Sequence, residues 1–149
     1  MKNRKNQSGF TIIELLIVVV VIGILATLVI VTYSGIQMKN RDTKRKNDVE
    51  AIGMQLEVYN ATTGSYPALH ELQDSSWATA NLKNFNSSHL VAPGSKFDSI
   101  SNIISTKTYQ YVPGPEGCTT SKRNCSTFTL TAKLEAGNTQ PVVVRNVSN

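Results

Sequence analysis

The hydrophobic positions of the chain form three successive patterns. An unbroken apolar run extends from Phe10 to Val31 and contains one acidic residue, Glu14. The sequence then turns polar without a proline as far as Glu57, and its apolar residues follow helical spacing. From Thr106 onward the spacing shifts towards alternation, which is typical of strands. The patterns predict a long helix followed by a small sheet.

The apolar run is long enough to cross a membrane. Its roughly 22 residues would extend about 33 Å as an α-helix, and a bilayer core is about 30 Å thick. The positive charges of Lys2, Arg4 and Lys5 precede the run and favour a cytoplasmic N-terminus. A secretory signal has an apolar core of about 7–15 residues and a small-x-small cleavage site, so the longer run disfavours that interpretation.

Glu14 needs an explanation within this run. An acidic residue near the middle of a spanning helix costs roughly 2.5–3.5 kcal/mol on insertion, and less near an interface, so such residues usually have a polar partner or a function. A plain single-span anchor that tolerates one glutamate is the alternative interpretation.

The helix is predicted to continue beyond the membrane. Val49, Ile52, Leu56 and Tyr59 are spaced by three, four and three residues, which places them on one helical face. Asn60 and the sequence Gly64-Ser65-Tyr66-Pro67 are a breaker. We therefore expect one helix from about 10 to about 60, with a membrane half at 10–31 and an amphipathic half at 32–60.

A short segment resembles a known processing site. Residues 5–16, K-N-Q-S-G-F-T-I-I-E-L-L, resemble those of type IV prepilins and of the pseudopilins of type II secretion. The resemblance extends to about residue 70 and includes the breaker after the helix. It implies that a membrane-embedded prepilin peptidase removes residues 1–9, cutting between Gly9 and Phe10, and methylates the new amino group of Phe10. Val31 departs from the family pattern, because many type IV pilins have a proline near that place.

The resemblance also implies an assembly. Glu14 would compensate the N-terminal ammonium of a neighbouring subunit in the hydrophobic core of a homo-oligomeric helical filament. An assembly ATPase and a polytopic platform protein would drive extrusion from the inner or cytoplasmic membrane, and the subunit itself would need no cofactor. The first interpretation is a type IV pilin that forms an extracellular filament for adhesion, motility or DNA uptake.

Two other interpretations stay open. The chain is alternatively a type II secretion pseudopilin that forms a short periplasmic filament. From a different class, it is a monomeric membrane-anchored binding module, which predicts no processing at Gly9 and no large assemblies.

A basic cluster follows the membrane half. Five positive charges lie within eight positions: Lys39, Arg41, Lys44, Arg45 and Lys46. We interpret them as a solvated helix face near anionic lipid headgroups or acidic residues of adjacent subunits. Salt-dependent contacts to DNA are the alternative. Removal of the leader would lower the net charge from +5 to +2, because the leader carries three positive charges.

Residues 61–149 supply a globular head. Three strands are predicted, and their apolar positions are Tyr109 and Tyr111, then Phe128, Leu130, Ala132 and Leu134, then Val142, Val143 and Val144. Residues 113–117 and 136–139 would connect them in an antiparallel meander. Short helical pieces are expected at 70–72 and 102–104. The fold class is α+β, a long N-terminal helix packed on a small antiparallel sheet, which is the ladle that the resemblance also implies.

The two cysteines, Cys118 and Cys125, enclose a six-residue loop. In an exported domain a disulfide is the economical interpretation, and it would shape a loop that displays Lys122 and Arg123. Zinc is disfavoured because only His70 and His89 remain as nitrogen ligands, without metal-like spacing. The resemblance to pseudopilins implies a possible calcium site in the late loops, for which Glu116, Glu135 and backbone carbonyls are the candidate ligands, but acidic residues are sparse after Asp98. We therefore expect no metal. We also expect no catalytic residues, because nucleophile, phosphate-loop and paired-histidine motifs are missing.

Overall fold

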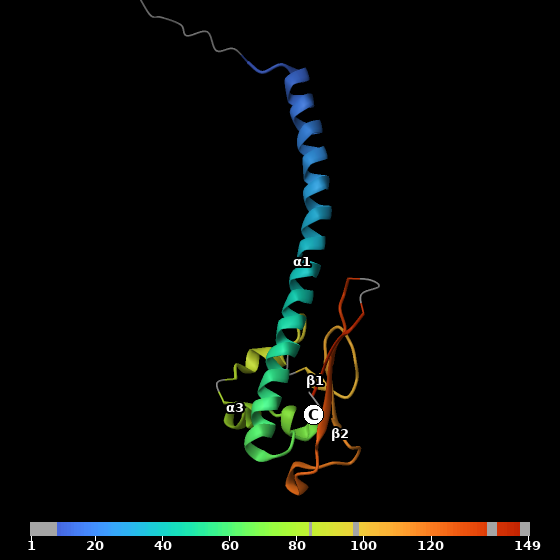
Figure 1. Ribbon diagram of the computed structural model, residues 1–149. Coiled ribbons are helices and arrows are strands. Elements are labelled where there is room, and N and C mark those ends of the chain that lie inside the picture. The colour runs from blue at the N-terminus through green and yellow to red at the C-terminus, as the bar shows by residue number, and fades with distance from the viewer. Residues whose placement is uncertain (1–8, 84, 97–98, 137–139, 147–149) are drawn as a thin grey trace, which may run out of the picture. The chain divides into compact units, whose positions relative to one another are not determined.

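The computed structural model describes residues 9–83, 85–96, 99–136 and 140–146. The leader charges Lys2, Arg4 and Lys5 and residues 137–139 of the predicted 136–139 connection lie outside the described residues. The chain divides into two compact units, residues 1–37 and residues 38–149. Helix α1, Ile12–Thr63, contributes to both units (Figure 1).

The long helix matches the predicted one closely. It begins two residues later and ends three residues later than the expected limits of 10 and 60. The N–H of Gly64 donates to the carbonyl of Asn60 at 2.7 Å, and Gly64 has a φ of 78°. Glycine adopts this left-handed conformation without a steric cost, so it ends the helix as the breaker predicts.

The core of the second unit lies between α1 and a sheet. Val49, Ile52 and Leu56 are completely buried, which confirms the predicted helical face. The helix approaches the sheet closely at Gly53, where a Cβ atom would lie 2.7 Å from a methyl carbon of Val144. A larger residue at that position would push the last strand away from the helix.

The sheet has four strands in the order β1-β2-β3-β4. They are β1 Ile100–Ser101, β2 Tyr109–Gly114, β3 Thr127–Ala132 and β4 Val142–Arg145. The pairs β2–β3 and β3–β4 are antiparallel, as predicted, but β1 pairs with β2 in parallel. The expectation of a three-stranded antiparallel sheet is therefore wrong, because a two-residue strand is too short to show a periodic pattern. The predicted strand also ends before Leu134, at Ala132.

One face of this sheet packs on α1. Tyr109, Tyr111, Phe128 and Leu130 alternate with more exposed neighbours and are buried in the same core as Leu56. Register pairs Tyr111 with Leu130 on this face and Val112 with Thr129 on the other. The second face therefore carries Val112, Val143 and Arg145, which are exposed.

Short helical turns connect α1 to the sheet. Helix α2, Leu69–Leu72, confirms the predicted piece at 70–72, and α3, Ser75–Asn81, begins at an Asp74 side chain that accepts the Ser76 N–H. A 3-10 turn, η1 Ser87–Leu90, follows before the sheet, and a second one, η2 Thr120–Lys122, lies between β2 and β3. The helical piece predicted at 102–104 is wrong. Those residues belong to the β1–β2 loop, where side-chain hydroxyls of Ser101 and Thr108 bond the backbone of Ile103.

Candidate functional site: an exposed apolar helix and a buried arginine cluster

The first unit exposes an apolar surface with no covering partner among its described residues. Every side chain described from Phe10 to Ile30 is exposed, and Phe10 is 88% exposed. Helix α1 is the one helix in the described chain that is long and apolar enough to cross a membrane, by length and composition. Such a continuous apolar surface marks a contact with lipid or with other protein.

Glu14 lies at the beginning of this helix and is bonded to its own chain. Its Oε2 accepts the backbone N–H of Thr11 at 2.8 Å and the Thr11 hydroxyl at 2.7 Å. In return the Thr11 hydroxyl oxygen accepts the N–H of Glu14 at 3.3 Å. This reciprocal arrangement is a capping box, which satisfies helix N–H groups that have no partner within the helix.

Thr11 is a residue that the sequence interpretation missed. The signal was present, because threonine followed three residues later by glutamate is the sequence pattern of a capping box. The carboxylate of Glu14 therefore caps the start of the helix. This role is additional to the pairing with a neighbouring subunit that the family resemblance implies. A shallow hollow beside it is lined by Phe10, Leu15, Ile17 and Val18.

The predicted cleavage bond, between Gly9 and Phe10, lies in an exposed part of the chain. Gly9 and Phe10 are both exposed and precede the first helical residue, Ile12. A peptide bond in an exposed, non-helical segment fits the active site of a peptidase more readily than a bond within a helix.

The two cysteines are joined by a disulfide between Cys118 and Cys125. The enclosed loop contains η2 and rests on α2, because the hydroxyl of Thr120 contacts Glu71 and accepts the Ala68 N–H at 2.9 Å. Lys122 and Arg123 are exposed on this loop.

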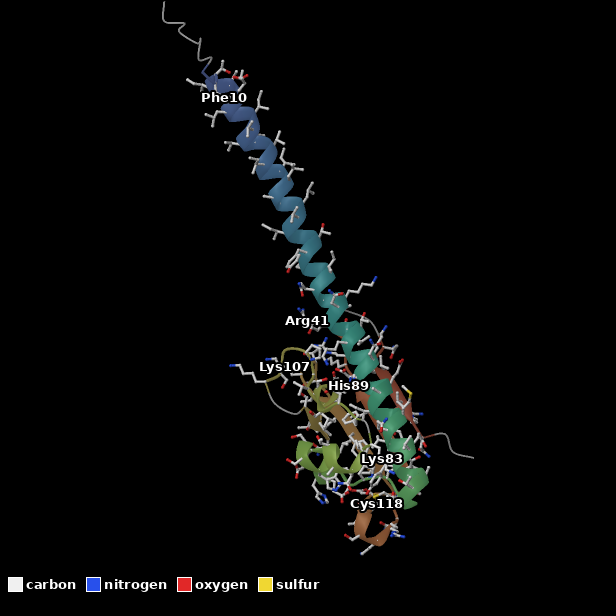
Figure 2. The ribbon with its side chains drawn as sticks, turned by 90° about the vertical axis from the view of Figure 1, so that its left-hand side faces the viewer. Phe10, Arg41, Lys83, His89, Lys107 and Cys118 are labelled. Atoms are coloured by element: carbon white, nitrogen blue, oxygen red, sulfur yellow. A yellow bond between two sulfur atoms is a disulfide. The ribbon has the colours of Figure 1, made fainter. Side chains whose placement is uncertain are left out.

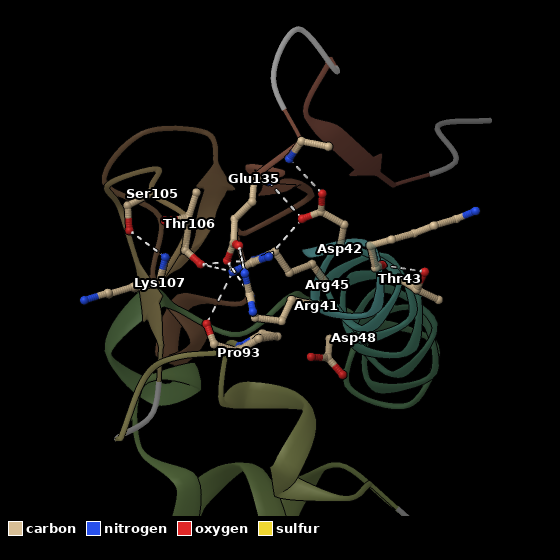
Figure 3. Close-up of polar contacts among 12 residues, drawn as sticks. Arg41, Asp42, Thr43, Arg45, Asp48, Pro93, Ser105, Thr106, Lys107 and Glu135 are labelled. Carbon is tan, nitrogen blue, oxygen red and sulfur yellow. Dashed lines mark hydrogen bonds and ion pairs between the residues drawn. The ribbon is translucent and has the colours of Figure 1, made fainter. Parts of the chain in front are cut away.

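The basic cluster on α1 is not a solvated face throughout, which corrects the sequence interpretation. Arg45 is 1% exposed, and its guanidinium is surrounded by oxygen atoms (Figure 3). It donates to Asp42 at 2.9 Å, to the carbonyl of Thr106 at 2.8 Å and to Glu135 at 2.5 Å. A buried charge is costly unless it is paired and hydrogen-bonded, and Arg45 is both.

Arg41, about one helical turn before Arg45, binds the same carboxylate, that of Glu135. Its Nε donates to Glu135 at 2.9 Å, while Asp42 accepts the backbone N–H groups of Glu135 and Ala136 at 2.9 and 3.0 Å. The segment after β3 is thereby fixed to α1. Because both oxygens of Glu135 accept guanidinium hydrogen bonds, this candidate calcium ligand is engaged within the chain. The described residues contain no group of three or more His, Cys, Asp and Glu arranged to hold a metal ion.

Asp48 is another buried carboxylate on α1, and it lies three residues after Arg45. Asp48 accepts hydrogen bonds from Lys44 and from the hydroxyl of Tyr109, each at 2.6 Å, and contacts Nδ1 of His89 at 2.8 Å. Burial, followed by the hydrogen bond to Asp48, raises the pKa of Tyr109. Three of the five clustered cations therefore have acidic partners in their own chain: Arg41, Lys44 and Arg45.

The Arg41–Glu135–Arg45 cluster predicts sensitivity to acid. The hydrogen bond from Arg41, followed by that from Arg45, lowers the pKa of Glu135 from 4.5 to about 2. A lowered folded-state pKa means that the stabilisation is complete above the unfolded-state pKa and is lost as pH falls towards the folded-state value. Stability should therefore fall between about pH 4.5 and about pH 2.

The variant Glu135→Gln should remove part of this acid dependence and destabilise the chain at neutral pH. The measurement is urea unfolding of the full chain in detergent, followed by the fluorescence of its one tryptophan, Trp77. Glu116→Gln is the matched control, because Glu116 is exposed. An unchanged acid profile in Glu135→Gln would contradict the assignment.

Comparison with known proteins gives two kinds of match. A family model described as "Prokaryotic N-terminal methylation motif" matches residues 4–30. The chain is also 38% identical over 68 residues to type II secretion system core protein G of Pseudomonas aeruginosa, which covers 46% of this chain and 48% of that protein.

Proteins with the same name in two other bacteria show similar agreement. The chain is 36% identical over 67 residues to that of Vibrio cholerae, covering 45% of this chain and 46% of the relative. It is 32% identical over 71 residues to that of Escherichia coli, covering 48% and 49%. The chain thus spans about half the length of the curated relatives that it matches, and no solved structure matches it. The methylation motif and the shared sequence make about half of this chain similar to type II secretion system core protein G, and they support a relationship to the type IV pilin and pseudopilin family.

Proposed function

We propose that the chain is a pilin-like structural subunit that polymerises into a filament. The exposed apolar surface of the first unit is the observation that carries the proposal. In the membrane, lipid covers this surface in the precursor. In the filament, the same surfaces of neighbouring copies cover one another, so the apolar residues are never left in water.

The proposal includes a membrane-anchored precursor with a cytoplasmic N-terminus. A prepilin peptidase would cut between Gly9 and Phe10 and methylate the new amino group. The methylation motif over residues 4–30 and the exposed, non-helical position of Gly9 and Phe10 support this step. Assembly would depend on an ATPase and a platform protein in the membrane, and the subunit would have a structural role and not a catalytic one.

Processing is tested on the protein isolated from its own host. Mass spectrometry of the N-terminal peptide should show a chain that begins at Phe10 and is heavier by one methyl group. An intact Met1 would contradict the proposal and favour a monomeric anchored binding module. Replacement of Gly9 by a bulky residue should leave the leader attached, while the matched change Ser8→Ala should not.

Glu14 is proposed to have two roles. Its Oε2 caps the helix through Thr11 within one subunit. Its negative charge would compensate the ammonium of Phe10 from a neighbouring copy, so that both charges enter the apolar core as a pair. Removal of one partner of a buried pair costs about 3–5 kcal/mol, because the other charge is left uncompensated.

The two roles are separated by two substitutions. Glu14→Gln removes the charge but keeps an oxygen that can cap the helix, since glutamine also serves in capping boxes. Thr11→Ala removes the cap hydroxyl and keeps the charge. Filaments should be lost in Glu14→Gln although the protein still inserts in the membrane, and Thr11→Ala should retain more assembly. Electron microscopy and sedimentation of sheared filaments measure the outcome, and normal filaments from Glu14→Gln would contradict the charge pairing.

The kind of filament has two candidates. A type IV pilus that extends from the cell is one. A short periplasmic pseudopilus is the other, and the matches to type II secretion system core protein G favour it. Deletion of the gene separates them: loss of surface filaments with normal secretion indicates a pilin, and accumulation of exported enzymes in the periplasm indicates a pseudopilin.

A further inference from the structure

The second unit also exposes large apolar side chains in separate places. Two of them, Met54 and Val58, lie on α1, and Met54 is 64% exposed. Two others, Ile103 and Ile104, lie on the loop between β1 and β2, and Ile103 is 66% exposed. Their high exposure distinguishes them from the core, and each pair has an exposed charge next to it, Glu50 on the helix and Lys107 on the loop.

The helix patch consists of Glu50, Met54 and Val58. These residues are spaced by four and form one stripe, while Val49, Ile52 and Leu56 face the sheet. The surface beside the stripe is hollowed, and Ala51, Gln55, Phe85, Asn86 and His89 line the hollow together with Met54. Within the described chain Glu50 forms no ion pair, although Lys46 is one turn away on the same helix.

The loop patch consists of Ile103, Ile104 and Lys107. Its backbone is fixed by hydrogen bonds, because Arg45 donates to the carbonyl of Thr106 and the Thr108 hydroxyl donates to the carbonyl of Ile103 at 2.8 Å. The apolar residues of this patch are therefore presented on a constrained loop. A surface that is already ordered loses little conformational entropy when a partner binds.

The charged residue of the loop patch points away from the helix that carries the other patch. Figure 3 shows the side chain of Lys107 pointing away from α1, and Figure 2 shows it directed outward from the unit. Each patch combines two apolar residues with one charge, and the two charges have opposite sign. Their chemistry is thus complementary between copies, with Glu50 opposite Lys107 and Met54 opposite the two isoleucines.

We propose that the helix patch of one copy binds the loop patch of the next copy in the filament. This inference rests on the proposed function and adds a contact between the second units. The two surfaces are different, so the contact is heterologous, and a heterologous contact that does not close into a ring propagates as a helical filament. A second copy is the favoured occupant because assembly through the first units places both patches at high local concentration.

Charge reversal tests the pairing. Glu50→Lys and Lys107→Glu should each lower filament yield by about tenfold, the loss expected when a central interface contact is worth about 1.4 kcal/mol. A chain that carries both substitutions should recover the yield, because each copy then offers the opposite pair. Glu116→Lys and Lys83→Glu are the matched controls, since both residues are exposed and lie outside the patches.

Cysteine pairing tests the geometry directly. Filaments made from a chain with Met54→Cys and Ile103→Cys should give a ladder of disulfide-linked multimers on non-reducing gels. Met54→Cys with Val143→Cys is the control, because Val143 is exposed on the outer sheet face. Dimers without higher multimers would overturn the propagating contact.

The outcomes distinguish this contact from the proposed function. Wild-type filaments together with unaffected charge variants and no ladder would overturn the contact and leave the filament proposal intact. Absence of wild-type filaments in a host with its assembly machinery would overturn the filament proposal itself. Unfolding followed by Trp77 fluorescence should match between variants and wild type, which shows that any lost assembly does not reflect a misfolded head.

Discussion

One helix has to satisfy two different environments, and the rest of the structure follows from that constraint. Within the first unit α1 is apolar on all sides, and none of its described side chains from residue 10 to 30 is buried. Within the second unit the same helix has one apolar face, which the sheet covers through residues such as Ile52 and Leu56. The first pattern requires partners outside the chain, whereas the second is satisfied inside it.

The side chain of Arg45 fixes the part of α1 that lies in the second unit to the loops of that unit. A guanidinium has five N–H donors, and its burial is tolerable only if oxygen atoms converge on it from several segments. Asp42 lies on the same helix, Thr106 on the β1–β2 loop and Glu135 on the segment after β3. One side chain thus connects three parts of the chain that are distant in sequence. The hydrogen bonds from Arg45 to the carbonyl of Thr106 also hold the backbone of the loop patch in place.

The predictable features were those set by local patterns. The apolar run, the face that contains Val49 and Leu56, the breaker at Gly64 and the antiparallel strands all depend on short-range spacing, and the structure has them. The Thr11 capping box was equally readable but was overlooked. The insertion cost of the Glu14 charge indicates a partner outside the chain, but it gives no information about the hydrogen bonds that Glu14 makes with Thr11.

The features that sequence reasoning missed depend on long-range contacts. A run of cations on a helix is usually solvated. The residues near Arg45 in the sequence do not indicate that Thr106 and Glu135 lie beside it, because these two residues are distant along the chain. The parallel strand β1 is similar, because Ile100 and Ser101 acquire strand geometry only through their pairing with Tyr109 and Gln110. Buried ion pairs and two-residue strands are consequences of the completed fold, so they become visible only after the core has been assembled.

The capping box also bears on the proposed assembly. In the single chain the Glu14 carboxylate is held by Thr11 at the start of the helix, so its position is fixed before any neighbour arrives. An acceptor that is already oriented pays little entropy when a cation approaches. A carboxylate held in this way also retains some hydrogen bonding in the membrane, where an isolated charge would have none. The four residues Thr11–Glu14 start the helix. In the proposed filament the same carboxylate would also bind its partner's cation, so one group would serve both the helix cap and assembly.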